Sequence, residues 1–232
     1  MTAGLIVAAG KGERLPGKLA KQYLPLAGQP VLCRAMNVFA ACDAIDELVL
    51  IVPAADVEYC RKTILPRVST KKPVALAAGG LRRQDSVFNG LRALAGDRDG
   101  IVVIHDGVRP FVTSGMIRNC IDGLSEADGC IAAVPVSDTI KTVDSRSRIT
   151  GTVNRDHAWL AQTPQAFRCD MLLKAHQTAL ENGWDVTDDA ALLERLGRTV
   201  GVIPGSSLNI KITSPDDLLL AAAIAGLTDG GR

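Results

Sequence analysis

Short apolar runs alternate with helix-length segments along most of this 232-residue chain. Most of the runs are hydrophobic at nearly every position, which is typical of strands covered on both faces. The alternation predicts an α/β fold, a doubly wound and mostly parallel sheet. The predicted strands are Leu5–Ala8, Leu48–Val52, Val74–Ala77, Ile101–Ile104, Ile131–Val134 and Thr199–Ile203. The predicted helices cover residues 30–41, 54–66, 83–96, 113–126, 168–181, 187–196 and 214–227.

Two of the predicted helices begin with capping signals. Ser214 is followed by a proline and two aspartates, which places a capping hydroxyl, a first-turn proline and two acids in favourable order. Thr187 is followed by two aspartates and is expected to cap in the same way.

Residues 136–154 interrupt the alternation. Two alternating runs surround Asp144–Arg148, which predicts a β-hairpin. A lone hairpin is marginally stable in water, so we expect it to project as an arm and to pack on a second subunit in a homodimer. We expect residues 1–228 to form a single domain and residues 229–232 to be a disordered tail.

Composition excludes several classes of partner. The net charge is +1 and aromatic residues make up 3% of the chain, so we expect neither nucleic acid nor an anionic membrane as a partner. The longest apolar run, Leu218–Leu227, is about half of a membrane span. The six cysteines contain no C-x-x-C pair, which indicates buried free thiols in a reducing cytoplasm. We therefore expect a cytoplasmic protein.

The loop after the first predicted strand suits a polyphosphate. Its small residues Ala8, Ala9 and Gly10 allow backbone N–H groups to approach an anion. Its cations, which would close over that anion, outnumber its one acid, Glu13; they are Lys11, Arg14, Lys18 and Lys21.

Three other interpretations of this loop compete. The dinucleotide-binding fingerprint requires a third glycine where Leu15 stands. A P-loop is nearly matched by residues 12–18, but Leu19 replaces the hydroxyl that must reach magnesium. A solvated connection without a ligand is the third alternative. The loop from Ala9 to Pro25 is much longer than the usual connection of about 2–6 residues, which favours a function.

Further polar groups follow the other predicted strands. Gly79 and Gly80 allow a flat base to lie against the backbone, with Ser86 as a reading side chain; a plain turn capped by Ser86 or Asp85 is the alternative. Asp106 ends a strand, where a metal ligand or a hydroxyl anchor would lie, although Arg109 could simply neutralise it.

Three more residues are candidates for binding. Arg155 suits bidentate phosphate binding and Thr163 offers a hydroxyl beside a rigid proline, but each could be an ordinary surface residue. Lys211 lies in a short alternating stretch, 209–213, that predicts a strand before the last helix. Lysine is uncommon in strands, so it either has a function or faces solvent on an edge strand.

These motifs occur together in one family. The ordered patterns A-A-G-x-G-x-R, K-Q-Y, G-G-x-x-R-Q-x-S-V, H-D-x-x-R-P, T-V-x-R, Q-T-P-Q-x-F and N-I-K-x-T run from about residue 3 to residue 227. The chain resembles the 2-C-methyl-D-erythritol 4-phosphate cytidylyltransferases, which have a Rossmann-like nucleotidyltransferase fold. Ribitol- and other polyol-phosphate cytidylyltransferases share the first three motifs and are the alternative.

The resemblance implies a role for each candidate. Ala8, Ala9 and Gly10 would line the nucleotide, Arg14 and Lys21 would hold the triphosphate of CTP, and Lys211 would face its α-phosphate. Gly79, Gly80 and Ser86 would read cytosine. Asp106 would anchor hydroxyls or help to hold Mg²⁺ or another divalent cation, which the phosphates would mainly bind. The residues implied to hold methylerythritol phosphate are Arg109, Thr139, Arg155, Thr163 and Thr187, with Thr139 and Arg155 donated by the neighbouring subunit's arm.

The implied reaction is transfer of CMP from CTP to methylerythritol phosphate with release of pyrophosphate. Leu81 and Asn154 depart from the acids of some relatives, which affects the side-chain reading of cytosine and the setting of Arg155. Two anions must meet in this reaction, so positioning and charge neutralisation would suffice for catalysis. A P-loop kinase and a catalytically silent nucleotide-binding module remain as other classes.

Overall fold

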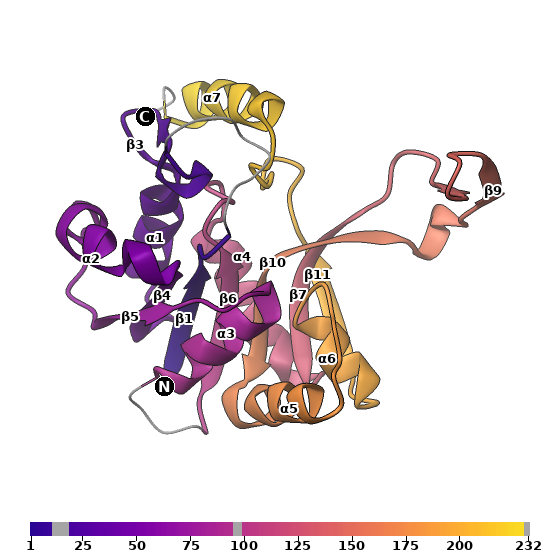
Figure 1. Ribbon diagram of the computed structural model, residues 1–232, viewed down its shortest axis with the longest axis horizontal. Coiled ribbons are helices and arrows are strands. Elements are labelled where there is room, and N and C mark those ends of the chain that lie inside the picture. Colours follow the sequence, from indigo (N-terminus) through magenta and orange to yellow (C-terminus); the bar gives the residue numbers. More distant parts are fainter. Residues whose placement is uncertain (11–18, 95–98, 230–232) are drawn as a thin grey trace.

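A seven-stranded sheet in the order β11-β7-β10-β6-β1-β4-β5 forms the centre of the molecule (Figure 1). The computed structural model describes residues 1–10, 19–94 and 99–229. The strands are β1 Thr2–Val7, β4 Glu47–Val52, β5 Val74–Ala78, β6 Ile101–Asp106, β7 Gly129–Pro135, β10 Trp159–Arg168 and β11 Val200–Pro204. The six predicted strands are confirmed and are parallel to one another, so the α/β prediction is correct.

Helices cover both faces of this sheet, which explains the uninterrupted apolar character of its strands. Leu5 and Ile6 are neighbours in β1, point to opposite faces and are both fully buried. Ile6 belongs to the core under α1 (Val31–Ala41) and α4 (Ser114–Asp122). Leu5 belongs to the core under α3 (Arg83–Arg92), α5 (Cys169–Glu181) and α6 (Ala190–Arg195).

The strand β10 was missed by the sequence analysis. It lies between β6 and β7 and is antiparallel to both. The segment Gln162–Gln165 carries three polar side chains and Pro164, which cannot donate to a sheet, so the sequence pattern there is not that of a central strand. The pairing with β7 shifts register between Ala161 and Gln165, and this irregularity accommodates the proline.

Residues 54–66, predicted as one helix, form a succession of short turns. These are 3₁₀ turns at Ala54–Asp56 and Leu65–Arg67, the short α2 at Val57–Tyr59 and a π turn at Cys60–Ile64. Pro66 has no N–H to donate and crowds the preceding turn, so a regular α-helix cannot continue through it.

Two local predictions around the last helices were wrong and one was right. Residues 209–213 are not a strand, because their polar groups bond to separate partners: the Ile212 N–H donates to the Val108 carbonyl (3.0 Å). Thr187 does not cap α6, because the Asp188 carboxylate accepts from the Ala191 N–H (3.2 Å). Ser214 does cap α7 (Pro215–Asp229), accepting from the Asp217 N–H (3.2 Å).

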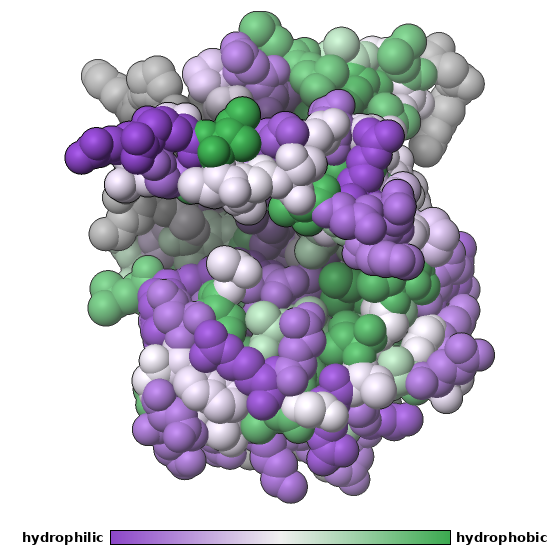
Figure 2. Space-filling model, turned by 90° about the vertical axis from the view of Figure 1, so that its right-hand side faces the viewer, coloured by the Kyte–Doolittle hydropathy of each residue, from purple (hydrophilic) through white to green (hydrophobic). Residues whose placement is uncertain are grey.

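The predicted hairpin arm is present and projects from the body (Figure 1). Its strands β8 (Lys141–Val143) and β9 (Ile149–Thr152) form a separate antiparallel pair, closed by a turn in which Asp144 accepts backbone N–H bonds from two arginines. The side of the molecule that bears the arm is largely polar and is hollowed across its middle (Figure 2).

The remaining elements complete the ends of the molecule. The small strands β2 (Pro25–Leu26) and β3 (Gln29–Pro30) pair with each other, and α7 packs over β2 through a minor apolar cluster. The six cysteines are free and buried, as predicted. No helix within the described ranges is long and apolar enough to cross a membrane.

Candidate functional site

A cavity of about 640 Å³ opens where the carboxyl ends of β1, β5 and β6 meet. Parallel sheets place their ligand sites at this edge, because the connecting loops gather there. The cavity wall comes from the loops after the three strands, from the turn at Lys21–Tyr23 and from the segment before α7. Its lining residues are Val7, Ala8, Ala9, Gly10, Lys21, Gln22, Gly80, Leu81, Arg82, Arg83, Ser86, Asp106, Val108 and Lys211.

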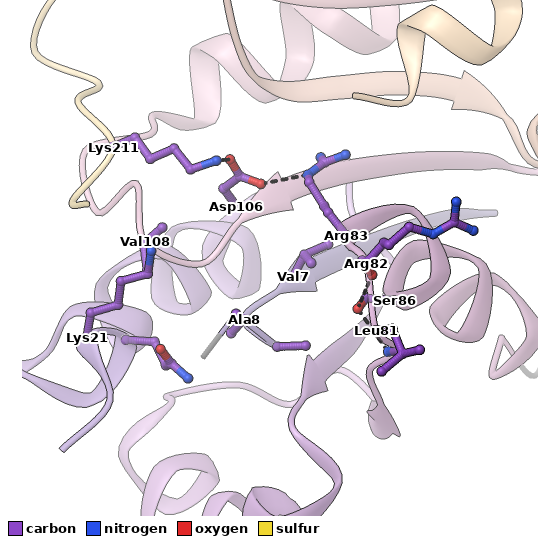
Figure 3. A pocket seen from close by; sticks show the side chains of 14 residues that line it. Val7, Ala8, Lys21, Leu81, Arg82, Arg83, Ser86, Asp106, Val108 and Lys211 are labelled. Atoms are coloured by element: carbon purple, nitrogen blue, oxygen red, sulfur yellow. Dashed lines mark hydrogen bonds and ion pairs between the residues drawn. The ribbon is translucent and has the colours of Figure 1, made fainter. Parts of the chain in front are cut away.

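Eight of the residues singled out from the sequence meet in this one cavity. They come from five separate segments of the chain and are Ala8, Ala9, Gly10, Lys21, Gly80, Ser86, Asp106 and Lys211. The side chains of Lys21 and Lys211 lie on the same side of the cavity, and Lys211 reaches across to Asp106 (Figure 3). Lys21 and Lys211, which are far apart in the sequence, therefore meet at one cavity.

The two glycines after β5 bring backbone close to neighbouring atoms. A Cβ at Gly79 would overlap Ala9, and a Cβ at Gly80 would overlap Asp85. Ser86 fixes this loop, because its hydroxyl accepts from the Gly80 N–H and donates to the Arg82 carbonyl, both at 3.0 Å. Asp85 accepts from the Arg82 N–H (3.1 Å) and so caps α3. Part of the simple turn interpretation is therefore correct, and the turn also forms a cavity wall.

Asp106 at the end of β6 is surrounded by cations. Its Oδ2 lies 2.7 Å from the Lys211 Nζ and 3.8 Å from the Arg109 Nε, and its Oδ1 lies 3.1 Å from the Arg83 Nε. Burial alone would raise the pKa of Asp106, but the charges of Arg83 and Lys211 outweigh it and hold the pKa well below the usual range. The carboxylate is therefore ionised at neutral pH.

Arg83 was not among the residues singled out from the sequence. It begins α3, lines the cavity and contacts two carboxylates, Asp106 and Asp189. Cations are disfavoured at the N-terminus of a helix, so an arginine there indicates a specific partner, and this signal could have identified it. Three cations and two carboxylates (Arg83, Arg109 and Lys211 against Asp106 and Asp189) leave one excess positive charge beside the cavity, which favours an anionic ligand.

A second layer of predicted residues lies behind the cavity. Thr163 is buried, and its hydroxyl accepts from the Asp106 N–H and contacts His105 Nδ1, both at 3.0 Å. Arg109 donates to the Asn209 carbonyl (2.7 Å). Burial lowers the pKa of His105 to about 4, so this imidazole is neutral at pH 7. Thr163 and Arg109 thus support Asp106 and do not line the cavity themselves.

The remaining predicted residues lie elsewhere. Thr139 and Arg155 are exposed on the arm, where Arg155 donates to the Ser137 carbonyl, and Thr187 is exposed before α6. Arg14 lies outside the described residues, as do Lys11 and Lys18. A single chain therefore brings together the described residues that were predicted to bind the nucleotide. The arm residues that were predicted to bind the acceptor do not line the cavity of their own chain. Their roles stay predictions.

Comparison with known proteins identifies the family of this chain. The sequence model of the family IspD, 2-C-methyl-D-erythritol 4-phosphate cytidylyltransferase, matches residues 2–226. The chain belongs to this family. A cytidylyltransferase of that name from Geotalea uraniireducens is 46% identical over 220 residues, covering 94% of each chain. One from Alkaliphilus oremlandii is 44% identical, covering 100% of this chain and 98% of its own.

A solved structure of the same family agrees with the fold. The 4-diphosphocytidyl-2C-methyl-D-erythritol synthase from Anaerococcus prevotii superposes with a TM-score of 0.83 at 32% identity, covering 96% of this chain and 94% of its own. Membership of the 2-C-methyl-D-erythritol 4-phosphate cytidylyltransferases therefore accounts for both the motif order and the Rossmann-like sheet.

The described side chains provide few ligands for a divalent cation at this site. No group of three His, Cys, Asp or Glu side chains in the described part of the chain could hold a metal ion. Asp106 supplies one carboxylate, and both of its oxygens already face cations. The residues thus fit a metal held mainly by phosphate oxygens of a ligand, with Asp106 as a candidate protein ligand.

Proposed function

We propose that this chain transfers CMP from CTP to 2-C-methyl-D-erythritol 4-phosphate and releases pyrophosphate. The observation that carries the proposal is the convergence of Lys21, Lys211 and Asp106 with the glycine-walled loop at Gly80 on one cavity, in a member of this family. A transferase needs such a cavity to hold a nucleotide while leaving its α-phosphorus open to attack.

The nucleotide side of the site is built on close backbone approach. Cytosine would lie against Gly79 and Gly80 beside Ser86, whose hydroxyl fixes the loop. A base read by hydrogen bonds is discriminated strongly, because a wrong base leaves buried polar groups without partners. Leu81 is 97% exposed at the cavity wall and carries no polar group, so base reading falls to the backbone and Ser86.

Catalysis would consist of charge neutralisation and alignment. A phosphate oxygen of the acceptor attacks the α-phosphorus in line and forms the new P–O bond. The bond from the α-phosphorus to the oxygen that bridges it to the β-phosphate breaks, and pyrophosphate leaves with that electron pair. Lys211 would face the α-phosphate, and Lys21, with Arg14, would hold the triphosphate. These charges reduce the repulsion between two anions without forming a covalent intermediate.

Magnesium or another divalent cation is part of the proposal. Bound to the triphosphate, it would withdraw charge from the reacting phosphorus and from the leaving pyrophosphate. Asp106 is the residue that would help to hold it or the ribose hydroxyls. In this structure Asp106 pairs with Lys211, whose ammonium has further N–H donors for a phosphate of the nucleotide.

The acceptor side is proposed to involve a second subunit. Thr139 and Arg155 lie on the arm, which carries exposed apolar side chains, among them Val143 (55% exposed) and Ile149 (66% exposed). Exposed apolar surface of this kind is expected to be covered by a partner. We propose a homodimer in which the arm delivers Arg155 to the acceptor phosphate of the neighbouring chain, with Arg109, Thr163 and Thr187 completing the acceptor side. The reaction would take place in the cytoplasm.

Pyrophosphate release tests the proposed function directly. The purified protein is incubated with magnesium and each of the four nucleoside triphosphates, against methylerythritol phosphate, ribitol phosphate and a no-acceptor control. We expect pyrophosphate with CTP and methylerythritol phosphate at a rate at least about 10²-fold above the other pairs. Release of ADP from ATP would indicate a kinase, ribitol phosphate as the preferred acceptor would indicate the related activity, and no release with any pair would contradict the proposal.

A further inference from the structure

We propose that Arg83, anchored by Asp189, is the positioning residue that fixes the orientation of Asp106 in the cavity. The inference rests on the proposed function, since it concerns the same site. Arg83 comes from the start of α3, Asp106 from the end of β6 and Asp189 from the residue before α6. The three side chains join elements that are otherwise far apart in the sequence.

The guanidinium of Arg83 bridges the two carboxylates with different nitrogens. Its Nε donates to Asp106 Oδ1 at 3.1 Å, and its Nη1 donates to Asp189 Oδ2 at 2.7 Å. Because the guanidinium is planar and rigid, fixing one nitrogen on Asp189 fixes the direction in which the other points. Figure 3 shows Arg83 meeting Asp106 from the side opposite to Lys211.

This bridge determines the rotation of the Asp106 carboxylate. One oxygen faces Arg83 and the other faces Lys211 Nζ at 2.7 Å, so each oxygen has its own cation. Without Arg83 the Asp106 Oδ1 would lose its cation, and only Lys211 and the more distant Arg109 (3.8 Å), both on Oδ2, would hold the carboxylate. The direction of the carboxylate, and with it the position of the Lys211 ammonium, would then be less well fixed. The expected loss therefore falls on turnover more than on nucleotide affinity.

Asp189 can influence the chemistry only through this bridge. Its side chain is 1% exposed and does not line the cavity, whereas Arg83 does. On its other side the Asp189 Oδ1 lies 3.3 Å from His176 Nε2, and that imidazole stacks on Phe88 of α3. The anchor is thus held by the packed helices behind the sheet edge.

The charges of Arg83, Asp106 and Asp189 favour the same geometry. Burial alone would lower the pKa of Arg83, but Asp189 and Asp106 outweigh it and raise the pKa above its ordinary value. The arginine stays charged in its largely covered position, so both bonds are charge-assisted, and the bond to the anchor Asp189 is the shorter of the two (2.7 Å against 3.1 Å). A lysine at residue 83 would keep the charge but could not present two nitrogens in a fixed plane.

A double-mutant cycle tests the proposal. The variants are Arg83→Lys, Asp189→Asn and the two combined, with Arg118→Lys and Asp43→Asn as matched controls on an exposed Arg–Asp pair of 3.0 Å. Circular dichroism and calorimetric CTP binding first establish the folded, binding-competent fraction. We expect kcat per competent site to fall about tenfold or more in Arg83→Lys and about fivefold in Asp189→Asn, with the CTP Kd changed less than about threefold. The double variant should be no slower than Arg83→Lys within about twofold, and the controls should be unchanged.

Two results would overturn the proposal. One is an unchanged kcat per competent site in variants whose melting temperature alone falls, which is the behaviour of a purely structural ion pair. The other is full additivity in the double variant, because Asp189 would then act without Arg83.

The proposed function itself fails separately, if the wild-type protein releases no pyrophosphate from CTP and methylerythritol phosphate. In that event a crystal structure of Asp189→Ala decides: the proposal requires the Arg83 Nε to leave Asp106, and an unmoved Arg83 contradicts it.

Discussion

Two regions of the molecule hold their candidate residues in place differently. One is the cavity floor, by which we mean Lys21, Arg83, Asp106 and Lys211, and the other is the hairpin arm. On the floor, Asp106 is buried at the end of a central strand and its side chain meets three cations. On the arm, Arg155 is exposed and donates to one backbone carbonyl of its own arm. The floor gains its geometry from the sheet and from ion pairs that no partner needs to complete. The arm has two short strands and an exposed surface, and a lone hairpin of this kind is only marginally stable in water.

Under the proposed function, this contrast gives the two anionic substrates different kinds of support. Groups that must be aligned to within a fraction of an ångström need rigid support. Asp106 has it at the end of β6, and Lys211, in the irregular segment 209–213, gains it from its ion pair with Asp106. Groups that admit and release an acceptor can lie on a mobile or intersubunit element.

Loss of a floor cation should have the largest effect. In Lys211→Ala and in Lys21→Ala we expect kcat to fall about 10²–10³-fold, the usual loss for one preorganised donor to developing charge. The fold should survive, because the Lys211 side chain is 40% exposed and Asp106 keeps Arg83 and Arg109. Steady-state pyrophosphate release measures the effect, and Lys62→Ala, an exposed lysine remote from the cavity, is the control. Turnover within about threefold of wild type would remove that lysine from the mechanism.

Removal of the arm should separate the two substrates. A variant with residues 141–152 replaced by a short Gly-Ser turn should bind CTP with a Kd within about threefold of wild type, since none of these residues lines the cavity. Its kcat/KM for methylerythritol phosphate should fall at least about 10²-fold, because acceptor contacts and the dimer are lost together. Calorimetry, kinetics and light scattering follow the three quantities. A monomeric variant with full activity would contradict the proposed role of the arm in binding the acceptor.

A single substitution on the arm should have a smaller effect of the same kind. Arg155→Ala removes charged hydrogen bonds to the acceptor phosphate, each of which typically contributes about 1.5–3 kcal/mol, so KM for methylerythritol phosphate should rise about 10- to 10²-fold. The CTP KM and the melting temperature should stay constant, because Arg155 is exposed. Arg146→Ala at the tip of the arm is the matched control. An unchanged KM for the acceptor refutes the phosphate-binding role.

The stability of the fold should also depend on pH through the buried imidazole of His105, next to Asp106. His105 has a pKa near 4 when folded and 6.5 when unfolded, so the unfolded chain binds more protons between these values. The unfolding free energy should therefore fall by roughly 1–3 kcal/mol as the pH drops from 6.5 to 4. Urea titrations across this range measure the slope, which should flatten in His105→Gln. A slope of opposite sign would mean that the imidazole is charged in the folded state.

Much of the fold was readable from the sequence because the hydrophobic pattern of its strands is unambiguous. Leu5 and Ile6, for example, are both apolar because both faces of β1 are covered. The strand β10 could not be predicted from the sequence, because its central residues Gln162–Gln165 are polar and yet buried. Hydrogen bonds to other segments satisfy these polar groups, for example the bond that Gln162 Nε2 donates to the Ser206 carbonyl (2.9 Å). Tertiary bonding of this kind leaves no periodic trace in the sequence.

The same distinction holds for the site. Lys21, Asp106 and Lys211 could be selected because each stands in an unusual local context, such as a carboxylate at the end of a buried strand. Arg83 stands in the pattern G-G-x-x-R-Q-x-S-V at a helix start, but its partner Asp189 lies 106 positions away and could not be identified from the sequence. Contacts between residues more than a hundred positions apart appear only once the sheet has folded.

Subunit complementation tests the central division between floor and arm most directly. Lys211→Ala and Arg155→Ala proteins, each nearly inactive at limiting acceptor, are mixed, dissociated and allowed to reassociate. If the arm serves the neighbouring cavity, half of the dimers are mixed, each has one site with both residues intact, and about a quarter of wild-type activity returns. If Arg155 serves the cavity of its own chain, or if the protein is a monomer, the mixture regains no activity, and the account of a site shared between two chains is contradicted.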